Sequence, residues 1–93
     1  MSKYCGFAYA RHSLDYLRAL PKQARRIIVR AVTKLAFNPY PSEAVLVLGR
    51  LETEGERVYR IHVSDFRILY SVREDIVIVL DIASREDYEE TGH

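Results

Sequence analysis

Arginine and histidine side chains that could bind an anionic group and move a proton follow one another along the second half of this 93-residue chain. Arg60 and His62 fall on one face of an alternating pattern in residues 57–63, and Arg67 opens the next such segment. Arginine stays protonated at any working pH, so it stabilises negative charge and does not act as a base. Histidine exchanges its proton near neutral pH, and His62 is therefore the candidate general base.

A structural interpretation of these residues stands beside the chemical one. His62 can be an ordinary exposed strand residue, and Arg60 and Arg67 can be surface arginines in ion pairs worth about 0–1 kcal/mol. Asp81, the one charge in the apolar segment 76–83, either orients a neighbouring arginine or neutralises it. Carboxylates crowd the C-terminal end, where an anion site is expected to be basic: Glu86, Asp87, Glu89 and Glu90.

Strands must hold these side chains, and the residue pattern predicts four of them. Residues 4–10 are aromatic-rich and uncharged, which is typical of a strand. Residues 57–63 and 66–72 are predicted as antiparallel neighbours joined by a tight turn at residues 64–65. Residues 76–83 are apolar on both faces except at Asp81, which predicts a central strand.

Two helices are predicted between the first strand and the later ones. Ser13 is the expected N-cap of the first helix, and Pro21 ends it and opens the second. The second helix carries apolar residues at i, i+3, i+4, i+7, i+8 and i+11, the period of a helix with one buried face. These residues are Ala24, Ile27, Ile28, Ala31, Val32 and Leu35. Pro39 and Pro41 prevent the helix from continuing.

A strand, a helical hairpin and a meander of three strands predict an α+β fold, with both helices packed on one face of a small antiparallel sheet. The length, with 48% hydrophobic and 29% charged residues, fits a single domain over residues 1–93 and excludes two domains. Cys5 is the one cysteine, which excludes an internal disulfide, and the scattered histidines have no zinc-ligand spacing. No metal or cofactor is therefore expected.

The chain is expected to be cytoplasmic. Its longest apolar runs, such as residues 76–80, are far shorter than a membrane span, and residues 1–6 show no secretory pattern. Its charges are unevenly distributed: residues 1–50 carry 9 Lys/Arg against 2 Asp/Glu, a net of +7, and residues 51–93 carry 5 against 11, a net of −6. A basic half suggests an acidic partner.

The second predicted helix carries what we call the basic stripe: Lys22, Arg26, Arg30 and Lys34. These residues recur every four positions on the face opposite the apolar one. The stripe is either a solvated helix face or a docking surface for an acidic partner.

Three features together resemble the RelE/ParE family of bacterial and archaeal toxins. They are the helical hairpin, the run YRIHVSDFRILY at 59–70 and the ending DIASREDY at 81–88, and the resemblance covers nearly the whole chain. It implies a RelE-like, microbial-ribonuclease-like fold and an antitoxin partner. The RelE branch implies cleavage of messenger RNA in the ribosomal decoding site without metal, and the ParE branch implies poisoning of DNA gyrase.

Carried over position by position, the resemblance implies a catalytic set of Arg60, His62, Arg67, Arg85 and Tyr88. Attack of a 2′-hydroxyl on phosphate needs a base, an acid for the leaving oxygen and cations around the transition state. The arginines are expected to clamp the phosphate, with His62 as base where the family more often has lysine. Arg85 is also expected to donate a proton or hydrogen bond to the leaving oxygen, and Tyr88 to orient the 2′-hydroxyl or stack on a base.

The leading hypothesis is a RelE-like toxin that is a metal-independent, ribosome-dependent messenger endoribonuclease. The alternative is a binding module, either a ParE-like gyrase inhibitor or a catalytically degenerate toxin. The five matching residues favour the enzyme, and the acidic second half favours the binder. Expected partners are an antitoxin, the ribosome with its messenger or else gyrase, and operator DNA through the antitoxin complex alone. The basic stripe can then also contact ribosomal RNA or an acidic antitoxin segment.

Overall fold

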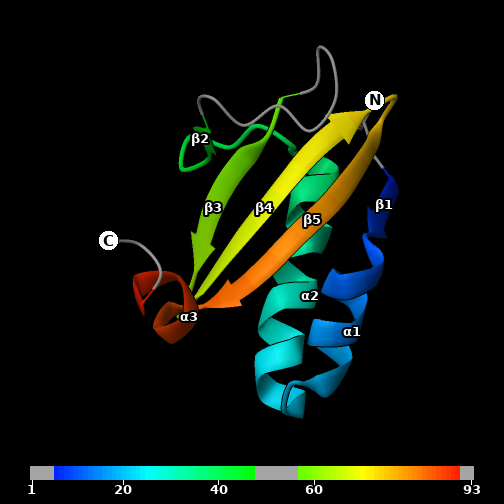
Figure 1. Cartoon of the computed structure of the whole chain (residues 1–93). Coiled ribbons are helices and arrows are strands. Elements are labelled where there is room, and N and C mark those ends of the chain that lie inside the picture. Colours follow the sequence, from blue (N-terminus) through cyan, green and yellow to red (C-terminus); the bar gives the residue numbers. More distant parts are fainter. Residues whose placement is uncertain (1–5, 48–56, 91–93) are drawn as a thin grey trace.

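The computed structural model of the chain describes residues 6–47 and 57–90, with the backbone alone for residues 88–90. The elements in these residues are β1 (Gly6–Tyr9), α1 (Arg11–Ala19), α2 (Lys22–Phe37), β2 (Val45–Leu46), β3 (Tyr59–Val63), β4 (Phe66–Arg73), β5 (Ile76–Ser84) and α3 (Arg85–Glu90). Figure 1 shows α1 and α2 on the same face of the sheet, and α3 beside the turn that joins β3 to β4. The predicted α+β fold with a helical hairpin on one sheet face is confirmed.

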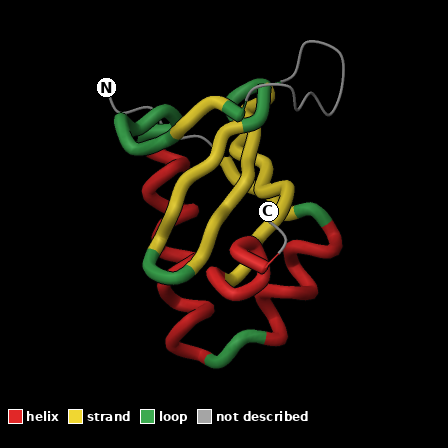
Figure 2. The backbone as a smooth tube through the Cα atoms, turned by 60° about the vertical axis from the view of Figure 1, so that its left-hand side comes forward, coloured by secondary structure: helices red, strands yellow, loops and turns green. Residues whose placement is uncertain are grey.

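The described strands form one sheet in the order β1-β5-β4-β3-β2. β3, β4 and β5 make the predicted antiparallel meander, and Figure 2 shows the helical hairpin running along this sheet. β1, however, pairs with β5 in parallel, so the sheet is not antiparallel throughout. The helical hairpin takes the chain from β1 at one edge of the sheet to β2 at the other edge, and the meander then returns to place β5 beside β1. β2 adds a two-residue edge strand beyond the meander.

The core lies between α2 and the sheet. Ile28 and Val32 are 0% exposed and Leu35 is 2% exposed, which confirms the apolar face predicted for this helix. They pack in one cluster with residues of β4 and β5: Ile68, Tyr70, Val77, Val79 and Ile82. Ile27 belongs to the same apolar period but is 40% exposed, because it lies at the border of the packed face.

The start of α1 differs from the prediction. Ala10 holds the N-cap position without a side-chain cap, and the N–H of Leu14 donates to its carbonyl at 2.9 Å. β1 runs directly into the helix, since the N–H of Ala10 also donates to the carbonyl of Val79 at 2.9 Å. Ser13 is therefore inside the first turn and 0% exposed, and its predicted role as N-cap is wrong.

α3 was not predicted, and it explains part of the acidic C-terminal end. The hydroxyl of Ser84 accepts a hydrogen bond from the N–H of Asp87 at 3.3 Å, in the manner of an N-cap. Glu86 and Asp87 occupy the first turn of this helix, where carboxylates interact favourably with the helix dipole. These two acidic residues thus have a structural reason and do not by themselves argue against an anion site nearby.

Tyr70 of β4 is expected to make stability depend on pH. Its hydroxyl donates to the carbonyl of Pro39 at 2.7 Å, and burial, followed by the neighbouring Tyr59, raises its pKa above the ordinary value of 10.0. The unfolded chain releases this proton near pH 10 while the folded chain keeps it. The stabilisation is therefore present below about pH 10 and is lost as the pH rises toward the folded value.

We expect the free energy of unfolding to fall above pH 10 by up to about 1.4 kcal/mol per pH unit because of Tyr70. Tyr70→Phe should remove this part of the slope and cost about 1–2 kcal/mol at pH 7, since the Pro39 carbonyl loses its donor. Urea denaturation between pH 7 and pH 11 measures both effects. An equally steep decline in the variant would contradict the prediction.

Candidate functional site

The sheet face opposite α1 and α2, which we call the open face, carries the predicted catalytic residues of β3 and β4. Ile61 is buried in the core cluster, so the alternation of β3 places Arg60 and His62 on the open face. His62 lies directly opposite Arg67 of β4. Leu69 of β4 pairs with Arg60 of β3 on one side and with Asp81 of β5 on the other. Since directly opposed residues share a face, Arg60, His62, Arg67 and Asp81 form one polar cluster.

Asp81 is the centre of the contacts in this cluster. Its Oδ2 atom lies 3.6 Å from Nη2 of Arg67, whose side chain is 28% exposed. Its Oδ1 atom lies 3.3 Å from Nε2 of His12 in α1. One carboxylate of β5 thus contacts both a guanidinium from β4 and an imidazole from α1, and it balances the charge of the guanidinium.

A β-bulge places Asp81 on the open face. Val79 is 0% exposed in the core, and strict alternation would put Asp81 in the core as well. The register between β4 and β5 shifts between Leu69 and Tyr70: Tyr70 pairs with Val79 and Leu69 with Asp81, which leaves Leu80 as the extra residue. The bulge therefore turns the carboxylate to the side where it meets its partners, and the cost of burying a charge in the core is avoided.

Arg85 lies at the same end of the sheet as the His62–Arg67 pair. It begins α3 directly after Ser84, which pairs with the first residue of β4. Its N–H donates to the carbonyl of Asp65, in the turn between β3 and β4, at 2.6 Å. This bond ties the start of α3 to the hairpin turn and holds the exposed Arg85 next to the pair.

Four of the five predicted catalytic residues are thus on or beside the open face: Arg60, His62, Arg67 and Arg85. The fifth, Tyr88, belongs to α3, but its side chain lies outside the described residues. The Nε atom of Arg60 is buried and has no hydrogen-bond partner in the described part of the chain. A buried donor of this kind costs about 1–3 kcal/mol and, in a native protein, is a reason to look for a function.

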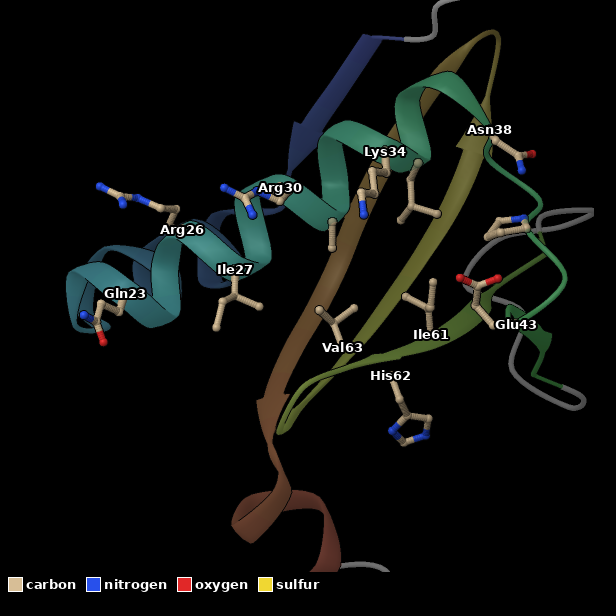
Figure 3. Close-up of a pocket in the computed structure, with 13 residues that line it drawn as sticks. Gln23, Arg26, Ile27, Arg30, Lys34, Asn38, Glu43, Ile61, His62 and Val63 are labelled. Atoms are coloured by element: carbon tan, nitrogen blue, oxygen red, sulfur yellow. The ribbon is translucent and has the colours of Figure 1, made fainter.

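A second candidate site is a groove of about 790 Å³ between α2 and β3. Arg26, Arg30 and Lys34 of the basic stripe line it, and Lys22 is not among its lining residues. Its apolar lining consists of Ile27, Ala31, Leu35, Pro41, Ile61 and Val63. Figure 3 shows Ile61 and Val63 pointing toward α2 and the ring of His62 pointing away from it. His62 nevertheless belongs to the lining, so the groove and the open face meet along β3.

The short β2 strand shapes this groove. β2 pairs with Tyr59 and Arg60, and its register does not extend to residues 61–63, so the groove reaches the edge of the sheet there. Glu43 is the acidic residue in the lining, against three basic ones. The groove thus combines an apolar floor with a mainly basic wall, which suits an acidic segment that also carries apolar side chains.

Two features of these sites were not predicted from the sequence. His12 and Asp81 are far apart along the chain, and no local pattern relates them. The groove had a partial signal, since Ile27 lies beside the basic stripe in the helical period, but an exposed apolar residue cannot be told from a buried one by periodicity.

Metal ligation and membrane spanning are two further features to consider in residues 6–47 and 57–90. No group of three or more His, Cys, Asp and Glu side chains in this part of the chain is placed to hold a metal ion. None of its helices combines the length and the apolar character needed to cross a membrane.

Comparison with known proteins places this architecture among toxins. Residues 9–88 match a family model described as the ParE toxin of the type II toxin-antitoxin system parDE. The structure is similar to the archaeal RelE–RelB complex from Pyrococcus horikoshii OT3, with a TM-score of 0.71 and 25% identity over 89% of this chain and 96% of that one. No curated protein matches.

Two further solved structures share the fold. One is the toxin–antitoxin complex RelBE2 from Mycobacterium tuberculosis, with a TM-score of 0.69 and 19% identity over 88% of this chain and 99% of that one. The other is the isolated E. coli RelE toxin, with a TM-score of 0.67 and 18% identity over 95% of each chain.

Proposed function

From the premise that this chain belongs to the RelE/ParE toxin family of type II toxin–antitoxin systems, we propose that it is a metal-independent endoribonuclease that cleaves messenger RNA on the ribosome. One observation carries the proposal. His62 and Arg67 are directly opposed on the open face, with Arg60 and Arg85 beside them. An imidazole, which can accept a proton, stands among three permanent cations, and attack of a 2′-hydroxyl requires this combination.

In the proposed reaction, His62 takes the proton of the 2′-hydroxyl as the 2′-oxygen forms a bond to phosphorus. The bond from phosphorus to the 5′-oxygen breaks, its electron pair goes to that oxygen, and the oxygen takes a proton from solvent, which leaves a 2′,3′-cyclic phosphate and a 5′-hydroxyl. Arg60 and Arg67 stabilise the charge on the non-bridging oxygens, and Arg85 donates a hydrogen bond to the leaving oxygen. Tyr88 orients the 2′-hydroxyl or stacks on a base.

The ribosome has a physical part in this proposal. A positioned base raises the rate of such a reaction about 10²–10⁴-fold, and one electrostatic donor raises it about 10²–10³-fold. In-line alignment of the 2′-oxygen with the phosphate adds several kcal/mol, and a messenger bent in the decoding site supplies it. Free RNA is therefore expected to be cleaved poorly, and the toxin is proposed to act in the cytoplasm, where translating ribosomes are found.

His62→Ala and Arg85→Ala are each expected to lower cleavage at least about tenfold, a loss of about 1.4 kcal/mol of transition-state stabilisation. His62→Ala removes the base, and Arg85→Ala removes the hydrogen bond to the leaving oxygen. Both side chains are exposed, so the fold should be retained. Primer extension on messenger held on translating ribosomes, with free messenger in parallel, measures the effect.

Arg73→Ala is the matched control for these variants. It removes an exposed arginine at the end of β4 that is farther from His62. The rate of cleavage should therefore be unchanged. If the wild-type protein makes no cuts on ribosomes or on free messenger, the nuclease proposal is wrong.

The second candidate function is inhibition of DNA gyrase, which the match to the ParE family model favours. In that case the open face is not a reaction site. A supercoiling assay with purified gyrase would then show inhibition by the wild-type protein and equal inhibition by His62→Ala.

We also propose that the α2–β3 groove binds an acidic, amphipathic segment of the cognate antitoxin. The lining supports a peptide over RNA, because nucleic acid backbones have no apolar side chains to fill a floor formed by residues such as Ile27 and Ile61. The similar RelE chain from P. horikoshii is in a complex with RelB. Contact with operator DNA is proposed to occur through this toxin–antitoxin complex.

A further inference from the structure

We infer that Glu43 is a specificity-determining residue of the α2–β3 groove. It selects an antitoxin segment that carries a basic side chain at the end of the groove where α2 ends, and acidic side chains along the rest. The inference rests on the proposal that this groove binds the cognate antitoxin. Among the described lining residues Glu43 is the one carboxylate, and three basic residues of α2 share the lining with it.

The charges of the lining are not paired with one another. Within residues 6–47 and 57–90, neither Glu43 nor Lys34 makes an ion pair, although both line the groove, and the same holds for Arg26 and Arg30. All four side chains are exposed, so water surrounds them in the free protein. A segment that fills the groove displaces this water, and each charge then needs a partner of opposite charge on the segment.

Glu43 lies at one end of the groove. Figure 3 shows Gln23 and Arg26 at one end of the lining, and Asn38 and Glu43 at the other. Asn38 is the C-cap of α2, and the C-terminal end of a helix carries a partial negative charge. The helix dipole and the Glu43 carboxylate therefore act in the same direction. The groove is most positive near Arg26 and least positive near Glu43.

The loop that carries Glu43 is fastened to the sheet. The hydroxyl of Tyr70 donates to the carbonyl of Pro39 at 2.7 Å, and the N–H of Ala44 donates to the carbonyl of Pro41 at 3.0 Å, which closes a turn around Glu43. Burial chiefly raises the pKa of Tyr70, and after two neighbouring tyrosines the charge of Glu43 adds to this effect. The carboxylate is thus near the anchor. A backbone that is already fixed loses little entropy when a partner binds.

The segment that fits this groove has charges that change along its length. Arg26, Arg30 and Lys34 are one turn apart, so they recur about every 6 Å along the helix axis. Acidic residues four apart in a helix, or two apart in a strand, match this spacing. A reversed segment would bring carboxylates against Glu43 and a cation against Arg26, and like charges brought together in an interface are strongly unfavourable. The groove therefore accepts the segment in one direction.

The sign of one mutational effect tests this role. If Glu43 only weakens an otherwise basic groove, Glu43→Gln removes a repulsion and the antitoxin binds more tightly. If Glu43 pairs with a basic side chain, Glu43→Gln should weaken binding about fivefold and Glu43→Lys about 30-fold. Isothermal titration calorimetry with the purified full-length cognate antitoxin measures these affinities. Glu43 is exposed, so the fold should be retained, and thermal unfolding checks this.

Two further variants serve as controls for charge. Glu74→Lys makes the same change of charge at an exposed glutamate between β4 and β5, outside the lining, and it should alter the affinity by less than about twofold. Glu43→Asp keeps the carboxylate, and it should bind within about threefold of the wild-type affinity.

A charge exchange identifies the residue that Glu43 contacts. Each lysine and arginine of the antitoxin is changed to glutamate in turn, and each variant is titrated into the Glu43→Lys toxin. One of them should bind this toxin at least about tenfold more tightly than the unchanged antitoxin does, because the exchanged pair restores the attraction. The same antitoxin variant should bind the wild-type toxin more weakly.

The outcomes separate the role of Glu43 from the proposal on which it rests, when Arg26→Glu combined with Arg30→Glu is measured in parallel. If this double variant loses affinity while Glu43→Gln binds as tightly as the wild type or more tightly, the role of Glu43 is wrong and the groove proposal stands. Failure of every charge-exchanged antitoxin to recover affinity for Glu43→Lys would also overturn that role. If the double variant binds as tightly as the wild type, the groove proposal is wrong, and this inference with it.

Discussion

Arg67→Ala is expected to lower the rate of messenger cleavage on the ribosome about 10²–10³-fold, the cost of removing one electrostatic donor from a transition state. Arg67 is the central cation of the open face, directly opposite His62 and in contact with Asp81. Its side chain is 28% exposed, so its charge is screened less by water than that of a fully exposed arginine.

Arg67→Lys distinguishes this role from simple charge. Lysine keeps the positive charge but lacks the planar fork that contacts two oxygens of a phosphate, so this variant should recover part of the lost rate. Single-turnover cleavage, with thermal unfolding as a check on the fold, measures both variants. Cleavage by Arg67→Ala within about twofold of the wild-type rate would contradict the assignment.

The second large effect is expected in the α2–β3 groove. Arg26→Glu combined with Arg30→Glu should weaken binding of the cognate antitoxin about 100-fold, or about 2.7 kcal/mol. The double change replaces two of the three basic residues in the lining with acidic ones, so an acidic segment meets repulsion where it met attraction. Isothermal titration calorimetry with the purified antitoxin at physiological salt measures the change.

Lys22→Glu is the matched control, because Lys22 belongs to the basic stripe but not to the groove lining. It should change the affinity by less than about threefold, as expected of a charge outside the contact. The double variant should also keep its cleavage rate, since Arg26 and Arg30 belong to α2 and not to the polar cluster of the open face. If cleavage falls and antitoxin affinity does not, the stripe contacts ribosomal RNA instead.

The elements that position the open face were largely predictable, because their signals are local. Alternation in residues 57–63 and 66–72 corresponds to β3 and β4, and the opposition of His62 and Arg67 follows from the tight turn between them. The buried face predicted from the apolar period of α2 is also confirmed, since Ile28 and Val32 are fully buried. Such patterns require only neighbouring residues, so a single sequence contains them.

The failures arose where packing overrode a local preference. Ser13 has the chemistry of an N-cap, yet β1 continues without a break into α1 and buries this side chain in the first turn. The parallel pairing of β1 with β5 depends on the helical hairpin crossing to the far edge of the sheet and on the meander returning from it. Local propensities are worth only a few tenths of a kcal/mol per residue, whereas the core contributes several kcal/mol for each large buried side chain.

The sequence by itself determined the types of the reactive residues, the faces of β3 and β4 on which they lie, and a family resemblance that the comparisons confirm. Only the tertiary structure decided which groups meet. The bulge at Leu80 turns Asp81 outward, and the return of the chain from β1 brings His12 to it. Both depend on how the whole core packs, because a bulge or a contact between distant segments is stabilised by burial elsewhere in the sheet and not by the residues that form it.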